Sequence, residues 1–184
     1  MSKFGDPNFE VHATTARIGA ATLLRIANAE ILPYDYVEFA RTMRRFGSQV
    51  DQAIADKRWK VSAAGLSTAI GRMEDAAVAF NAARDRALTA QLAPGVGKQV
   101  NASLLEVERR LTRPQGLVTR LWFRNLIYAA DENNGYSTMV LPSVNEAIRL
   151  GDQTAVGQEL TDLAQRFDAA TRALQVATEL LRKT

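Results

Sequence analysis

The sequence predicts an all-α protein: an antiparallel four-helix-type bundle with one long irregular excursion, at about residues 113–142, and a short extra helix. Apolar residues recur every three or four positions in several long segments, which is the pattern of helices with one buried face. The helical period fails only in the excursion. A length of 184 residues fits one domain of ordinary size, so we expect residues 1–184 to form a single helical domain.

The first two helices are separated by Leu32-Pro33. The earlier one covers roughly residues 11–30 and is apolar or small through its middle, so we expect it to be buried on several sides. The second lies between Asp35 and Lys57. Its first residue is followed three positions later by Glu38, the spacing of a capping box.

The next two helices end at proline-containing breaks. A long helix begins near Ser62 and ends before residues 93–97, the sequence Ala-Pro-Gly-Val-Gly, which cannot stay helical. A shorter helix with apolar residues from Val100 to Leu111 stops before Pro114.

The C-terminal third contains the excursion and two further helices. In the excursion, apolar islands surround a polar turn at residues 131–136. A short helix over residues 143–150 leads to a long amphipathic helix whose apolar stripe runs from Val156 to Leu181. Asp152 stands at the N-cap position of that helix, and Arg182 lies at the end where the helix dipole favours cations.

The composition is poor in catalytic side chains. No cysteine is present, which excludes disulfides, thiolate nucleophiles and cysteine zinc sites. His12 is the sole histidine. It is either a lone base or ligand, or a residue that caps or hydrogen-bonds near the start of the first helix, and the second interpretation is favoured.

Charge and hydropathy argue against nucleic-acid or membrane partners. The pI is 9.4, but the net charge is only +3, and basic residues alternate with acidic ones, as in residues 106–110. No basic stripe with interleaved aromatics is visible. No run approaches the roughly 18 apolar residues that a membrane helix needs.

Three candidate sites fail on their patterns. A di-metal helical bundle needs Glu-x-x-His pairs on two helices, and His12 has Phe9 three positions before it. Residues 95–98 lack the full phosphate-loop pattern and a preceding strand. Carboxylates such as Asp75 and Asp168 have arginine neighbours, so we interpret them as solvated ion pairs. No metal site and no catalytic residue is therefore predicted in this chain.

The polar turn is the remaining candidate. It combines Asn134, Gly135 and Tyr136 within the only long irregular segment, and segments of that kind commonly bind ligands. The alternative is a surface loop built from ordinary turn residues.

The chain resembles the C-terminal region of the glutamate carboxypeptidase II family, from about Lys3 to the end. No single motif decides the resemblance, but the ordered set is specific. The matching segments are Asp6-Pro7 with Phe9 and His12, Ala27-Asn28, Ile31 to Asp35, Glu108-Arg109, Pro114 to Leu117, Phe123 to Ala129, Asn134 to Tyr136, and Leu141 to Val144 with Ala147.

The resemblance implies the transferrin receptor-like dimerisation domain of M28-type zinc peptidases, a helical bundle that forms a homodimer. In that family a separate upstream domain carries out catalysis with two zinc ions, and the histidine matching His12 is not a zinc ligand. This chain would then be the C-terminal part of a longer protein and would have no activity of its own. The resemblance also implies an extracytoplasmic compartment, either periplasmic, secreted or membrane-anchored.

The resemblance gives the polar turn a role in substrate binding. In the family this loop reaches the catalytic cleft, and an Asn-Lys-Tyr sequence holds the carboxylates of a C-terminal glutamate. Here Asn134 and Tyr136 match, whereas Gly135 stands in place of the lysine. Losing that ammonium removes a charge-assisted contact worth roughly 1.5–3 kcal/mol. The implied partners are thus a second copy, the upstream peptidase domain and a peptide substrate.

Two other functions are compatible with the residues. One is a stand-alone helical adaptor that binds a partner protein in a groove. The other is a hydrolase that uses His12 with a nearby carboxylate.

Overall fold

The computed structural model describes residues 5–183. The chain forms two compact units that divide between Tyr34 and Asp35. Residues 1–4 and 184 of the predicted domain, including Lys3, where the family resemblance begins, lie outside the described residues. That residues 1–184 form one domain stays a prediction.

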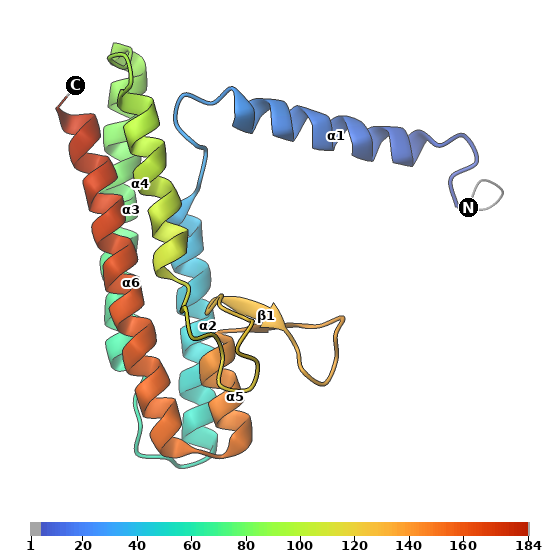
Figure 1. Ribbon diagram of the computed structural model, residues 1–184, viewed down its shortest axis with the longest axis vertical. Helices are drawn as coiled ribbons and strands as arrows, with labels where there is room; N and C mark the ends of the chain where they lie inside the picture. The colour runs from blue at the N-terminus through green and yellow to red at the C-terminus, as the bar shows by residue number, and fades with distance from the viewer. Residues whose placement is uncertain (1–4, 184) are drawn as a thin grey trace. The chain divides into compact units, whose positions relative to one another are not determined.

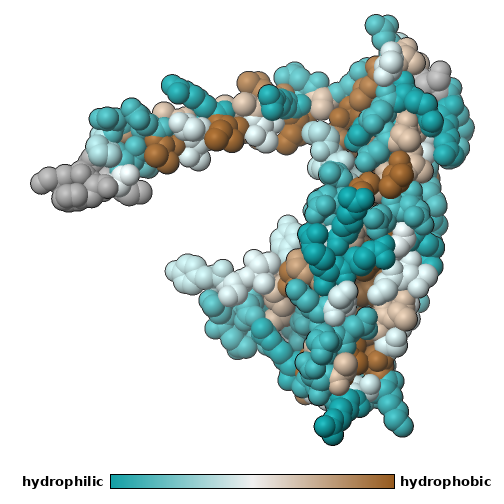
Figure 2. Space-filling view, turned by 180° about the vertical axis from the view of Figure 1, so that it is seen from behind, coloured by the Kyte–Doolittle hydropathy of each residue, from teal (hydrophilic) through white to brown (hydrophobic). Residues whose placement is uncertain are grey.

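The N-terminal unit contains one helix, α1 (Glu10–Ala27). Its existence confirms the periodicity, but within the N-terminal unit the expectation that it is buried on several sides is wrong, because α1 contains no buried residue there. Apolar side chains lie between polar ones along α1 (Figure 2), and Ile18, Leu23 and Leu24 are each more than 60% exposed. A unit of about thirty residues is too short to bury a helix of this length.

The C-terminal unit is a bundle of four long helices, α2 (Tyr36–Asp56), α3 (Ala64–Ala90), α4 (Val96–Arg110) and α6 (Gln153–Arg182). A short helix, α5 (Pro142–Leu150), precedes α6. Helix α6 packs along both α3 and α4, α2 packs along α3, and α5 packs against α6 (Figure 1). The predicted all-α bundle is confirmed.

The four long helices alternate in direction along the chain (Figure 1). Helices α2, α3 and α4 alternate in direction, as expected for short connections (Figure 1). The chain then passes through the excursion and α5, and α6 starts at the same end of the bundle as α3. Helices α3 and α6 therefore run side by side in the same direction (Figure 1).

The caps and the core agree with the sequence pattern. The Asp35 carboxylate accepts a hydrogen bond from the Glu38 N–H at 3.0 Å, and the Asp152 carboxylate accepts one from the Ala155 N–H at 2.9 Å. Phe167 of α6 is fully buried and stacks on a phenyl ring of α2. The largest buried side chains are Phe80, Phe167, Leu66, Ile70, Met73, Leu104, Leu117, Leu126, Leu141, Leu163, Leu174 and Val50.

The excursion is irregular, as predicted, apart from a small β-hairpin. Strands β1 (Tyr128–Ala130) and β2 (Thr138–Val140) pair antiparallel, with Ala129 opposite Met139. The two strands flank the polar turn and overlap the apolar islands at Tyr128 and at Met139-Val140. Leu117 and Leu126 are fully buried and fix the excursion to the bundle.

Candidate functional site

The polar turn connects β1 to β2 as a tightly hydrogen-bonded loop. The Asp131 N–H donates to the Ser137 carbonyl at 2.9 Å, and the Ser137 N–H donates to the Asn134 carbonyl at 2.9 Å. The Asn134 carboxamide accepts from the Tyr136 N–H at 3.2 Å and donates to the Ser137 hydroxyl at 2.9 Å. Asn134 therefore shapes the loop from within, as Asn side chains commonly do in turns.

Asp131 holds the base of this loop. One carboxylate oxygen accepts from the Asn133 N–H at 2.8 Å and from the Asn134 N–H at 3.2 Å, and the other binds the guanidinium of Arg149 on α5. The hydrogen bond from Arg149, followed by the backbone hydrogen bonds, lowers the pKa of Asp131 from 3.8 to about 2. The carboxylate stays ionised at neutral pH, and the loop is tied to the bundle by a charged contact.

Tyr136 and Gly135 are presented at the tip of the loop. Tyr136 is fully exposed, with a relative exposure of 104%. A Cβ added at Gly135 would have no heavy atom within 4 Å, and its backbone is outside the left-handed region. A longer side chain therefore fits at position 135 without strain. Asn134, Gly135 and Tyr136 all lie in this loop between β1 and β2.

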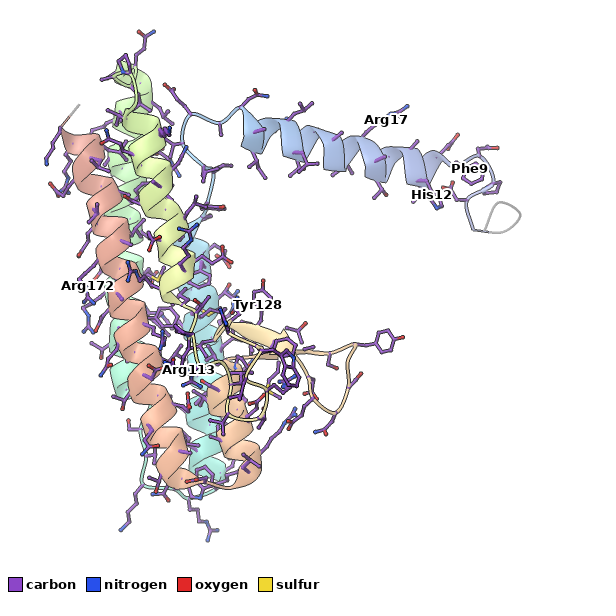
Figure 3. All side chains as sticks on the ribbon, in the orientation of Figure 1. Phe9, His12, Arg17, Arg113, Tyr128 and Arg172 are labelled. Atoms are coloured by element: carbon purple, nitrogen blue, oxygen red, sulfur yellow. The ribbon has the colours of Figure 1, made fainter. Side chains whose placement is uncertain are left out.

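His12 lies at the start of α1, beside the aromatic ring of Phe9 (Figure 3). Its ring Nδ1 hydrogen-bonds the carboxylate of Asp6, and its backbone N–H donates to the same carboxylate at 3.0 Å. These hydrogen bonds lower the pKa of Asp6. The prediction that His12 hydrogen-bonds near the helix start is confirmed.

Arginines that were not predicted as functional residues anchor the excursion. Arg120, whose side chain is 11% exposed, binds the buried carboxylate of Glu146 on α5 at 2.5 Å and the Ala130 carbonyl at 2.6 Å. Arg113, at the start of the excursion, binds Glu159 of α6 at 2.8 Å (Figure 3). The available signal was the presence of three arginines, Arg113, Arg120 and Arg124, in a segment without helical period, but the acidic partners of Arg113 and Arg120 are distant in sequence.

Most of the predicted surface ion pairs are confirmed. Arg72 of α3 binds both carboxylate oxygens of Asp168 on α6, at 2.7 and 2.9 Å, and Glu74 binds two arginines of α2. Asp75, predicted to pair as well, has no hydrogen bond or ion pair with any described residue.

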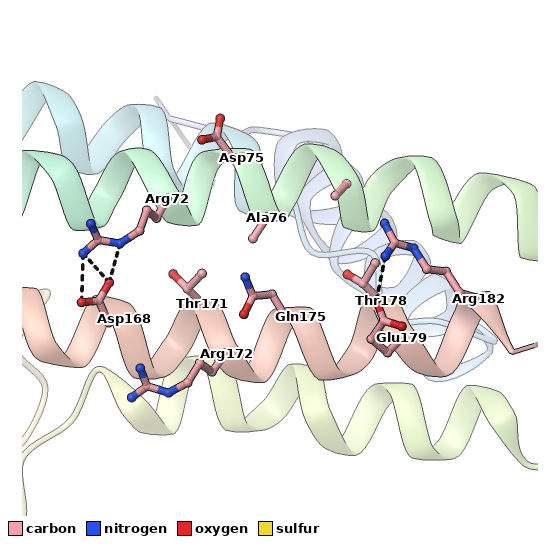
Figure 4. A pocket seen from close by; sticks show the side chains of 11 residues that line it. Arg72, Asp75, Ala76, Asp168, Thr171, Arg172, Gln175, Thr178, Glu179 and Arg182 are labelled. Atoms are coloured by element: carbon pink, nitrogen blue, oxygen red, sulfur yellow. Dashed lines mark hydrogen bonds and ion pairs between the residues drawn. The ribbon is translucent and has the colours of Figure 1, made fainter.

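A groove of about 820 Å³ runs between α3 and α6 (Figure 4). Its floor contains small side chains, and its rim contains acidic and basic ones. The lining residues are Arg72, Asp75, Ala76, Ala79, Asp168, Thr171, Arg172, Gln175, Thr178, Glu179 and Arg182.

Neither a metal cluster nor a membrane span is found in residues 5–183. Within that range, no three His, Asp or Glu side chains are grouped to hold a metal ion. No helix there has the length and apolarity to cross a bilayer.

The comparisons with known proteins identify the bundle. The family model described as the transferrin receptor-like dimerisation domain matches residues 61–175. The chain belongs to this family. The match to the transferrin receptor-like dimerisation domain spans α3, α4, the excursion, α5 and most of α6, and therefore includes both the polar loop and the α3–α6 groove.

Similar proteins extend the likeness over the whole chain. The chain is 27% identical to "Probable glutamate carboxypeptidase LAMP1" of Arabidopsis thaliana, with 99% of this chain and 26% of the relative covered. It is 25% identical to "Aminopeptidase NAALADL1" of Rattus norvegicus (98% and 23% covered) and 24% identical to "Probable glutamate carboxypeptidase VP8" of Zea mays (99% and 26% covered). This transferrin receptor-like dimerisation domain therefore spans about a quarter of the length of these curated relatives.

Proposed function

We propose that this chain is the non-catalytic, homodimer-forming module of a zinc-dependent peptidase related to glutamate carboxypeptidase II. The observation that carries the proposal is the match of the dimerisation-domain family over residues 61–175. The relatives named glutamate carboxypeptidase or aminopeptidase support a peptidase parent. The bundle itself supports a structural role, since its interior is apolar and its charged side chains mostly pair with one another.

The two zinc ions of the proposed peptidase do not fit this chain. The described carboxylates near the excursion are already bound to arginines, as Glu146 is to Arg120 and Glu159 is to Arg113. The single histidine lies in the other compact unit, hydrogen-bonded to Asp6. We therefore assign zinc binding to a catalytic domain outside this chain and derive no catalytic step here.

The polar loop is proposed to complete the substrate pocket of that catalytic domain. The loop is held rigid at its base by Asp131 and Arg149, and it presents the phenol of Tyr136 away from its own bundle. A phenol can donate a hydrogen bond to a substrate carboxylate. Asn134 supports the loop, and Gly135 leaves the position of the family lysine open.

Activity of the full-length parent tests the loop. Tyr136→Phe removes only the hydroxyl, and we expect kcat/KM for peptides to fall by about tenfold, the loss of one hydrogen bond to a charged group. Tyr128→Phe is the matched control, because Tyr128 is an exposed tyrosine of the same hairpin. Unchanged kcat/KM in Tyr136→Phe across a peptide panel contradicts the role.

A gain of function provides a second test of the same loop. Gly135→Lys places an ammonium where the family has one, in open space. We expect kcat/KM of the parent to rise for peptides ending in glutamate and to stay constant for peptides with a neutral C-terminal side chain. An equal change for both peptide classes argues against a carboxylate-binding role.

Self-association and metal content test the module itself. We expect the purified 184-residue chain to sediment as a dimer at high micromolar concentration. Sedimentation as a strict monomer contradicts the dimerisation proposal. A stoichiometric zinc ion bound to the purified chain, with hydrolysis that is lost in His12→Gln, supports the hydrolase alternative instead.

A further inference from the structure

The α3–α6 groove has a charge pattern that fits a second copy of itself. Of its charged rim residues, Arg72 pairs with Asp168, and Arg182 pairs with Glu179. This leaves Asp75 on α3 and Arg172 on α6, which are both exposed and have no ion pair or hydrogen bond within residues 5–183. The groove thus offers one unpaired carboxylate and one unpaired guanidinium.

The two unpaired groups lie on opposite edges of the groove. Asp75 extends from the edge of α3 that is remote from α6, whereas Arg172 extends from the edge of α6 that faces α4 (Figure 4). The ion pair between Arg72 and Asp168 sets the register of the two parallel helices. At a rise of 1.5 Å per residue, Asp75 lies about 4.5 Å beyond Arg72 along the axis of α3. Arg172 lies about 6 Å beyond Asp168 along the axis of α6. The two groups therefore lie at nearly the same height.

This arrangement suits a two-fold axis parallel to the helices and placed above the groove. Rotation about that axis puts α3 of the second copy over α6 of the first, and α6 over α3. In such an isologous contact residue i meets residue j while j meets i, so Asp75 of each copy meets Arg172 of the other. Both unpaired charges are then neutralised at once.

Neighbouring apolar residues extend the same contact. Val78 follows Asp75 by three residues, and Val176 follows Arg172 by four, so each valine lies one helical turn further along the same edge. Both valines are 54% exposed. The small side chains of Ala76 and Ala79 on the groove floor let a second helix approach closely.

We infer that the α3–α6 face is the dimer interface and that reciprocal contacts between Asp75 and Arg172 align the two copies. The inference rests on the proposed self-association and adds the surface and the symmetry. It commits to a second copy of this chain, because a groove with equal and opposite unpaired charges on its two edges is complementary to itself.

Charge reversal in the 184-residue chain tests the interface. Asp75→Arg and Arg172→Asp each replace two attractive contacts by two repulsive ones, and we expect the dimer Kd to rise about 10- to 30-fold for each variant. The double variant exchanges the charges and should restore the wild-type Kd. Glu108→Arg, which makes the same charge change on the exposed side of α4, should leave the Kd unchanged. Far-UV circular dichroism confirms that each variant is folded.

The possible outcomes distinguish a wrong interface from a failure of the proposed dimerisation. If the wild type dimerises and the single reversals leave the Kd unchanged, or the double variant fails to restore it, the assigned interface is wrong and the dimerisation proposal stands. A wild-type chain that is strictly monomeric overturns both. Loss of dimerisation in the single variants with recovery in the double variant supports the reciprocal contact.

Discussion

Gly116 provides a sharp test of how the excursion is built. Its φ of +72° lies in the left-handed region, and a Cβ there would overlap the carbonyl of Leu121 and lie 2.9 Å from the Leu121 Cα. The left-handed backbone costs an alanine about 1–2 kcal/mol. The overlap with backbone also forces the turn open and displaces Leu117, a fully buried side chain whose burial contributes about 1.5–3 kcal/mol. We expect Gly116→Ala to lower the free energy of unfolding by about 3–5 kcal/mol.

Gly95→Ala is the matched control. Gly95 has a φ of +85°, but a Cβ there has no heavy atom within 4 Å, so only the backbone cost of about 1–2 kcal/mol applies. Urea unfolding of both variants, followed by circular dichroism at 222 nm, measures the difference. Equal destabilisation of the two variants would show that the overlap with Leu121 does not constrain the excursion and would refute the reasoning.

Three further perturbations address the contacts that hold the loop and the core. Glu146→Ala leaves the Arg120 guanidinium buried without its carboxylate, and urea unfolding should show a loss of about 3–5 kcal/mol. Phe167→Ala opens a cavity in the centre of the bundle and should cost about 3–5 kcal/mol by the same assay. The pKa of Asp131 is lowered from 3.8 to about 2 in the folded chain. The ionised carboxylate therefore contributes its full stabilisation at a pH above 3.8, and this stabilisation is lost as the pH falls towards 2. A carboxyl carbon NMR titration should show that low midpoint, which should rise towards 3.8 in Arg149→Met; an unchanged midpoint would contradict the assigned cause.

The long helices could be predicted from the sequence because their signals are local. Asp35 and Asp152 cap the helices that follow them, and the apolar stripe of α6 is buried from Val156 to Leu181, as its spacing predicts. Residues three and four apart share a face whatever the tertiary structure is. The proline- and glycine-containing breaks were found for the same reason.

The contacts that position the loop could not be predicted, because they join residues distant in sequence. Arg120 and Glu146 are 26 residues apart, and Asp131 and Arg149 are 18 apart. No periodicity relates such pairs. The burial of α1 within its own unit was predicted wrongly for a related reason: the apolar composition of α1 indicates that the helix can be buried, whereas burial itself depends on which elements of that unit pack around it.

The side chains that hold the polar loop in place differ from those that the loop would present to a substrate. Asp131, Arg149 and Asn134 fix its backbone through hydrogen bonds that involve neither the side chain of Tyr136 nor any side chain at position 135. A residue exchange at position 135 therefore changes the chemistry of the tip without changing the fold of the loop. If the loop completes a substrate pocket, as we propose, substrate preference can differ between relatives through position 135 alone, while Tyr136 keeps a common orienting contact.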